Sequence, residues 1–343
     1  MTTGSGLDGQ LAFGEETTWG TKVTPTHAVE FDSESLQLNP TWLEPTGIRS
    51  GMKYKRVNRV VQSRRAVSGD FTVEVATKGM GLLWKHALAS GATPTQDGTD
   101  GAYKQVHTPG DFLGKGLTIQ VGRPEPSTGT VQPFTYSGCK VSQWQFSLTD
   151  GDIPTLQLTV DGRDEDTATA LVTPAYPEGA AVFDFTQASL TLGGTVATAA
   201  GLTTVTGGTA VATVITEITL SGEAGMATER YGIGNAGLKS EQLENATPTI
   251  TGTLSAEFNK TELYDLFTEE GTTPLHLSLV GEQIGASTDH FTLDFILPAV
   301  KLKTAQPNVG GPDVVAMSTD IEAYDNETDP VIQVLIWSDE TAL

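Results

Sequence analysis

Two segments of the chain, half a chain apart, repeat one order of polar and apolar positions. The first reads SGDFTVEVATKGMGLLWKHALAS at Ser68–Ser90, and the second reads TGTLSAEFNKTELYDLFTEEGT at Thr251–Thr272. In both, apolar and polar residues alternate and then give way to a short apolar run. Alternation with a period of two is typical of a strand with one buried face. Each segment therefore predicts a strand followed by a helix, over Met80–Leu88 in the first and Leu263–Phe267 in the second.

The distance between the two segments is constant along their length. Gly69 and Gly252 lie 252 − 69 = 183 residues apart, and Glu74 and Glu257 lie 257 − 74 = 183 residues apart. A strand-like stretch precedes each segment, and a strand, a Gly/Asp/Pro turn and another strand follow it. Two strand–helix units also arise by chance in a β-rich chain, but the agreement in order and spacing favours a tandem duplication.

The predicted fold is mainly β: two antiparallel β-sandwich or barrel-like domains, each with one flanking α-helix. Abundant glycine (38 residues) and the absence of long runs of helix formers support this. The prolines and glycine of TALVTPAYPEG indicate a connection. We predict an N-terminal assembly segment (1–26), a first copy (27–172), a linker (173–180) and a second copy (181–343). The Gly- and Thr-rich segment Met1–Thr26 is expected to become ordered only against neighbouring subunits.

Net charge narrows the possible functions. The chain carries 42 acidic and 20 basic residues, a formal charge of −22, and such a surface repels nucleic-acid phosphates. Cys139 is the single cysteine, so an intrachain disulfide is impossible. The first residues lack the features of a signal peptide, and no apolar run approaches the ~18 residues of a membrane span.

One interval has the opposite charge to the rest of the chain. Trp42–Arg65 holds seven cations against Glu44, a balance of 7 − 1 = +6, whereas the matching interval Gly222–Asn245 has 2 − 4 = −2. We call Trp42–Arg65 the basic arm and predict that it contacts the acidic surface of another copy of the chain. A solvated charged hairpin and a DNA-phosphate contact are the alternatives, and the acidic body opposes the second. The predicted contact residues are Arg49, Lys53, Lys55, Arg56, Arg59, Arg64 and Arg65.

The sequence gives little sign of catalysis. It contains no GxSxG, P-loop or HExxH motif, and its five histidines are scattered without metal-ligand spacing. The acidic run DGRDEDTATALV at Asp161–Val172 fails as a calcium loop, because Arg163 stands where the third position needs an oxygen ligand. A loose surface calcium site is the alternative for this run. We predict no enzyme, no cofactor and no metal site. A glycosidase-like pair of carboxylates is the weakest alternative.

The opening GQLAFGEETTWGTKVTPTHAVEFDSESLQLNP at Gly9–Pro40, together with the SGDFTVEV strand and its helix, resembles the major tail tube proteins of long-tailed (siphovirus-type) bacteriophages, especially those of actinobacterial hosts. The resemblance covers the first half well and the second half through the repeat. It implies a structural virion protein whose subunits join their sheets into rings, and whose stacked rings form the conduit for DNA ejection. It also implies assembly in the host cytoplasm, with DNA passing through the lumen without specific binding.

The family's rings have sixfold character, so the resemblance implies that a chain with two copies forms a pseudo-hexamer from three chains. Six chains with the second copy on the outside are the alternative. The resemblance further implies that the basic arm corresponds to a loop that reaches the adjacent ring. We expect Glu74 and Glu257 to supply lumen-facing charge. The implied partners are other copies of the chain and the tape-measure, tail-terminator and distal tail proteins.

The second copy departs from the simplest family pattern. It lacks the basic arm and carries a Gly/Thr-rich insertion at residues 193–214. A hypothesis from another class is therefore kept: a virion-surface or adhesin-type β module that recognises a host receptor or glycan, using aromatics such as Trp19, Trp42 and Trp337.

Overall fold

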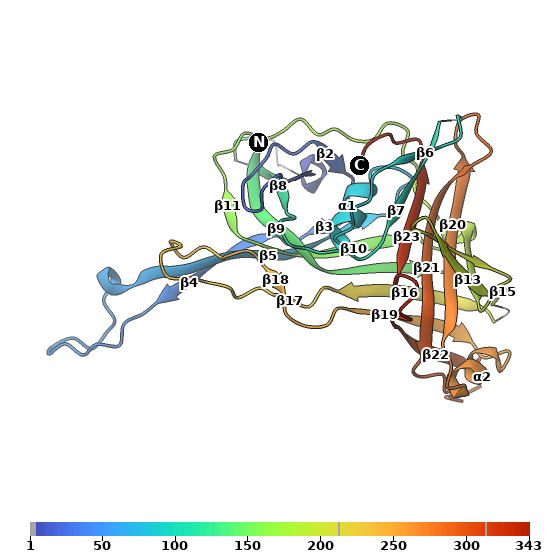
Figure 1. The fold of residues 1–343 in the computed structure, drawn as a ribbon. Coiled ribbons are helices and arrows are strands. Elements are labelled where there is room, and N and C mark those ends of the chain that lie inside the picture. Colours follow the sequence, from blue (N-terminus) through green and yellow to red (C-terminus); the bar gives the residue numbers. More distant parts are fainter. Residues whose placement is uncertain (1–4, 100, 126, 212, 313) are drawn as a thin grey trace.

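The computed structural model describes residues 5–99, 101–125, 127–211, 213–312 and 314–343. It is built largely of antiparallel strands with two short α-helices (Figure 1), which confirms the predicted fold class. Elements up to the linker are η1 (Gly6–Asp8), β1 (Gln10–Glu15), β2 (His27–Val29), β3 (Ser33–Glu34), β4 (Gln37–Leu43), η2 (Val57–Arg59), β5 (Val61–Glu74), α1 (Gly81–Ala87), β6 (Thr95–Asp97), β7 (Ala102–His107), β8 (Leu117–Glu125), β9 (Thr130–Thr149), β10 (Thr155–Gly162) and β11 (Asp164–Asp166). Those after it are η3 (Phe185–Gln187), β12 (Ala188–Leu192), β13 (Thr195–Ala199), β14 (Leu202–Thr206), β15 (Thr209–Ala210), β16 (Ile215–Glu223), β17 (Met226–Ala227), β18 (Leu243–Glu244), β19 (Thr249–Glu257), α2 (Glu262–Thr268), β20 (Thr273–Gln283), β21 (His290–Leu302), β22 (Ala316–Ala323) and β23 (Gln333–Ser338).

The two helices lie where the repeat predicts them, one after β5 and one after β19. Helix α1 is almost completely buried, and Leu83 and Trp84 have no exposed surface. Helix α2 buries only Leu263 among its described residues and keeps an acidic first turn in solvent. The apolar run in the first segment thus forms part of the core, whereas its counterpart buries Leu263 and packs the half-buried Leu266 and Phe267 against the core.

A continuous antiparallel path, the central sheet, runs through both copies. Its order is β4–β5–β10–β9–β16–β19–β22–β21, with β3 also on β5. A second layer contains β2–β1–β8–β9 from the first copy and β12–β20–β21–β23–β7 from both. The long strands β9 and β21 take part in both layers. The predicted copies are therefore joined by strand pairing through β9–β16 and β7–β23, and also by an isolated bridge between Ala76 and Val182.

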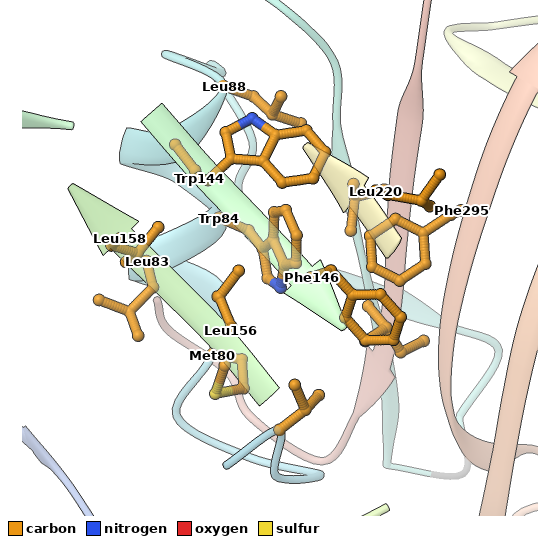
Figure 2. Close-up of a cluster of buried hydrophobic side chains, with 14 of the residues drawn as sticks. Met80, Leu83, Trp84, Leu88, Trp144, Phe146, Leu156, Leu158, Leu220 and Phe295 are labelled. Atoms are coloured by element: carbon orange, nitrogen blue, oxygen red, sulfur yellow. The ribbon is translucent and has the colours of Figure 1, made fainter. Parts of the chain in front are cut away.

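The apolar core is also common to both copies (Figure 2). The ring of Trp84 lies edge-on to Trp144 of β9 and to Phe295 of β21, with both centroid distances 5.3 Å. Phe295 also packs on Phe146, at 4.6 Å between centroids. Edge-to-face rings in this distance range are a favourable arrangement for buried aromatics. Helix α1 of the first copy therefore packs against side chains from both halves of the chain.

The N-terminal segment differs from its prediction. Residues 1–4 lie outside the described residues, but Gln10–Glu15 forms β1, paired with β2 and β8, and Leu11 and Phe13 are fully buried. The prediction that Met1–Thr26 is ordered only by neighbours is wrong for this strand. All of Gln10–Gly14 is buried, and a strand buried on both faces lacks the polar alternation that would reveal it.

Candidate functional site: a polar sheet face, a basic arm and a joint between copies

One face of the central sheet is polar from β5 to β22. Glu74 stands at one end of a cross-strand row that continues through Thr155, Ser147, Thr219 and Thr253 to Asp320. A parallel row contains Thr72, Gln157, Gln145, Ser221 and Thr251. These side chains are Ser, Thr, Gln, Asp and Glu. The second row continues past Thr251 to Glu322 of β22 and ends at Lys301 of β21, so the charges of the two rows from β5 to β22 are negative. The opposite face carries the buried apolar side chains of the core, so the sheet separates a dry face from a wet, acidic one.

The two glutamates expected in the lumen occupy matching places on this face. Glu74 of β5 lies opposite Thr155 of β10, and Glu257 of β19 lies opposite Ala316 of β22. Both side chains are half-buried. The sequence alternation thus placed them correctly on the polar side of their strands.

The basic arm leaves the body as an extension of the β4–β5 hairpin (Figure 1). Lys55 pairs with Glu44 inside the arm, and at its base Arg65 Nη2 lies 3.2 Å from Asp164 Oδ2. The Arg64 guanidinium lies 4.6 Å from the ring centroid of Tyr231. The remaining predicted contact residues form no ion pair among the described residues: Arg49, Lys53, Arg56 and Arg59.

Large apolar side chains accompany these cations into solvent. Ile48 is 100 % exposed, Val57 is 89 % exposed and Tyr54 is 87 % exposed. Exposed apolar side chains grouped in this way are a feature of surfaces that bind other proteins.

The joint between the copies was not predicted from the sequence. Strand β16 pairs with β9 so that Leu220 lies opposite Phe146 and Gly222 opposite Trp144. A Cβ on Gly222 would lie 2.3 Å from Trp144 Nε1, so only glycine fits beside the indole there. A lone glycine inside a strand pattern is the signal that could have indicated this close approach.

The loop after β16 folds over the first copy. It is the counterpart of the basic arm, and we call it the second-copy loop (residues 224–248). Lys239, 2 % exposed, forms a buried ion pair with Asp161, whose Oδ2 also accepts from Gln242 Nε2 at 2.7 Å. Lys140 Nζ lies 2.8 Å from Glu241 Oε1. Burial raises the pKa of Asp161 despite the lysine beside it, because the loop and strand β10 together remove the carboxylate from water.

The groups considered for chemistry have structural contacts. In the acidic run, Asp164 pairs with Arg65 and Asp166 with Lys22. His86 is buried beside Glu15, and burial lowers the pKa of its imidazole. Among the described residues, no group of three or more His, Cys, Asp or Glu side chains could hold a metal ion. No helix in the described part of the chain is long and apolar enough to cross a membrane.

The comparisons with known proteins fit a structural subunit. No curated protein matches the sequence. A family model described as "Phage tail tube protein" matches residues 6–323, which includes the first copy, most of the second copy, the basic arm and the joint. The chain therefore belongs to the phage tail tube protein family, whose members are structural, non-enzymatic components of the virion tail.

Proposed function

We propose that three chains close into a ring, with their six copies forming one continuous barrel, and that stacked rings make a tube through which DNA is ejected. The observation that carries this proposal is the β9–β16 joint. Within one chain, the last central strand of the first copy already pairs with the first central strand of the second. The same head-to-tail contact between chains would close a ring. If each copy is related to the next by one sixth of a turn, the six copies of three chains complete one full turn.

The central sheet has a free edge at each end for this purpose. Strand β4 has no partner on its outer side among the described residues, and neither has the stretch 303–308 that follows β21. Gln37 lies opposite Ser68 as Ser221 lies opposite Thr251, so β4 is the counterpart of β16. Ala316 is the counterpart of Thr155, because they lie opposite the matched residues Glu257 and Glu74. Ala316 pairs with Asn308 as Thr155 pairs with Ser147, so 303–308 is the counterpart of the end of β9. The two free edges thus correspond to the two strands of the internal joint.

Side-chain sizes at these edges are complementary. The position facing Trp144 in the internal joint is Gly222. Counting along the matched strands, the pair at the junction between chains is Ala305 and Leu38. In the internal joint the large residue is Trp144, on the strand of the first copy. Between chains the large residue is Leu38, on the opposite strand. The summed volume of the facing pair is thereby kept in a range that a packed interface accepts.

The backbone groups are complementary as well. The next pair in the same register joins Leu36 to Pro307, and proline has no N–H to donate. The Leu36 carbonyl needs none, because it already accepts from Tyr136 Oη at 3.0 Å and from Arg123 Nη2. Proline at this place also discourages wrong pairing of the edge before assembly.

A disulfide across the junction tests the ring. Gln37→Cys with Gln306→Cys places two thiols opposite each other at the junction, in the positions that match Ser221 and Gln145 of the internal joint. Gln37 and Gln306 are both exposed. Directly opposed residues in antiparallel strands have Cα atoms about 4.5–5.5 Å apart, within the range of a disulfide. The buried native Cys139 does not compete. We expect non-reducing gels of oxidised tubes to show one, two and three linked chains and no larger species.

A ladder that extends to six chains would instead support rings of six chains. Gln37→Cys with Glu270→Cys is the matched control, because Glu270 is exposed in the turn after α2 and away from the edge. Efficient linking in this control, or none in Gln37→Cys/Gln306→Cys, would contradict the proposed junction.

The polar face supports the assignment of a DNA conduit. If it lines the barrel, its carboxylates repel DNA phosphates, and the duplex slides without binding. Replacing Glu74 and Glu257 with lysine is expected to leave tubes intact in electron micrographs and to slow DNA ejection from particles built with the variant. The control is Glu270→Lys with Glu282→Lys, an equal charge change at exposed acids off the polar face. Equal ejection rates for the two variants would reject the lumen assignment.

The wider setting is part of the same proposal. The resemblance of the N-terminal stretch to tail tube proteins of long-tailed phages with actinobacterial hosts supports that phage type and host. Tube ends would bind the tape-measure, terminator and distal tail proteins, and assembly would take place in the host cytoplasm. We favour this over a receptor- or glycan-binding module because the free edges and the exposed arm are complementary to the chain itself.

A further inference from the structure

The basic arm and the second-copy loop are counterparts of nearly equal length. From Gln37 to Ser68 the chain advances 68 − 37 = 31 residues, and from Ser221 to Thr251 it advances 251 − 221 = 30. Their conformations differ completely: the loop lies on the first copy of its own chain, whereas the arm extends into solvent (Figure 1). In this chain, the loop has a preceding copy to pack against and the arm has none.

The cation that anchors the loop has an equivalent in the arm. Lys239 comes 18 residues after Ser221 and 12 residues before Thr251. Eighteen residues after Gln37 is Lys55, and 12 residues before Ser68 is Arg56. Either count places a cation of the arm where the loop has its anchoring lysine.

The carboxylate that receives the loop has an equivalent on the second copy. Asp161 of β10 lies between Ser68 and Lys140 on its neighbouring strands. Glu322 of β22 lies between Thr251 and Lys301 in the same way.

The Glu322 carboxylate is accessible, unlike that of Asp161. Its side chain is 32 % exposed, and it accepts from Lys303 Nζ at 2.9 Å and from Tyr324 Oη at 2.7 Å. The second copy thus presents at its surface the acid that in the first copy is already covered by the loop.

Charge favours the same placement. Residues 181–343 carry 5 − 22 = −17, whereas residues 1–180 without the basic arm carry 8 − 19 = −11. The arm, at +6, is therefore attracted most strongly to the second copy of another chain. The second-copy loop, with 2 − 3 = −1, is instead suited to the less acidic first copy.

We infer that in the assembled ring the basic arm folds over the second copy of the preceding chain, with Lys55–Arg56 on Glu322, as the second-copy loop folds over the first copy. The preceding chain is the one whose 303–308 edge pairs with β4, so the inference rests on the proposed ring. It assigns this contact of the arm to a neighbour in the same ring, whereas the family resemblance suggested the adjacent ring. Each ring would then be fastened at six equivalent places, three within chains and three between them.

Cysteine pairs distinguish the two placements. Glu322→Cys is combined with Lys55→Cys in one variant and with Arg56→Cys in another, and assembled tubes are oxidised. Contact within a ring links each arm to one neighbour, so we expect at least one variant to give a ladder that stops at the number of chains reached by Gln37→Cys/Gln306→Cys. A ladder that continues beyond that number would place the arm between rings and overturn the inference.

This design tests the proposed ring and the proposed arm contact independently. Linking through Gln37→Cys/Gln306→Cys without linking through either arm variant would keep the ring and reject the arm contact. Failure of all three pairs would reject both. In uncrosslinked protein, Glu322→Lys is expected to raise the concentration needed for assembly about tenfold, and adding Lys55→Glu and Arg56→Glu should restore it. Glu282→Lys is the control for charge alone, and an equal effect of this control would count against the specific contact.

Discussion

Replacing Trp84 with alanine is expected to lower the free energy of unfolding by about 3–5 kcal/mol, the usual cost of removing a large buried aromatic residue. The indole is fully buried and lies edge-on to Trp144 and Phe295, so its removal leaves a cavity bounded by both copies. Because the copies share this core, urea denaturation followed by circular dichroism should show one transition shifted as a whole.

Trp337→Ala is the matched control. Trp337 lies in β23, half-buried, with Lys104 Nζ 5.5 Å from its ring centroid, so its loss should cost clearly less than that of Trp84. Two separate transitions in Trp84→Ala, with only one of them shifted, would show that the copies unfold independently and that the common core contributes little to coupling them.

The sequence predicted the elements that have a local signature. Alternation revealed β5 and β19, and the apolar runs revealed α1 and α2, because a half-buried strand and a short helix impose their periods on adjacent residues. The same alternation placed Glu74 and Glu257 on the polar face, since side-chain direction in a strand follows from position alone. Charge counting identified the basic arm, because its excess of cations lies within one continuous stretch of the sequence.

Features that depend on distant partners escaped prediction. Strand β1 has no alternation because both of its faces are buried. The β9–β16 joint depends on Gly222 meeting Trp144, two residues that are 222 − 144 = 78 positions apart. Lys239 and Asp161 are also 239 − 161 = 78 positions apart, and each is one of 62 charged residues, so no local pattern indicates that they pair. Once the strand register was known, however, the repeat predicted counterparts for both contacts.

Replacing Lys239 with methionine is expected to cost about 3–5 kcal/mol, because removing one partner leaves the other charge buried without compensation. The uncompensated charge is that of Asp161, which then keeps Gln242 as its one side-chain donor among the described residues. Adding Asp161→Asn removes this charge and retains an acceptor for Gln242, so the double variant should recover most of the loss. Urea denaturation of both variants and the wild type measures the difference.

The pH dependence of the single variant gives a second test. Burial already raises the pKa of Asp161 in the intact pair, and loss of Lys239 raises it further. An acid whose folded pKa lies above its unfolded value favours the folded state when protonated. The deficit of Lys239→Met should therefore be smallest below the unfolded Asp pKa of about 3.9 and should grow as pH rises through the folded pKa.

Lys303→Met is the control, because it removes an exposed cation from the equivalent but partly exposed carboxylate of Glu322. Exposed pairs contribute at most about 1 kcal/mol, so this variant should remain close to the wild type at every pH. A Lys239→Met variant no less stable than Lys303→Met would mean that the second-copy loop does not hold the two copies together. The arm contact inferred by analogy with it would then lose its basis.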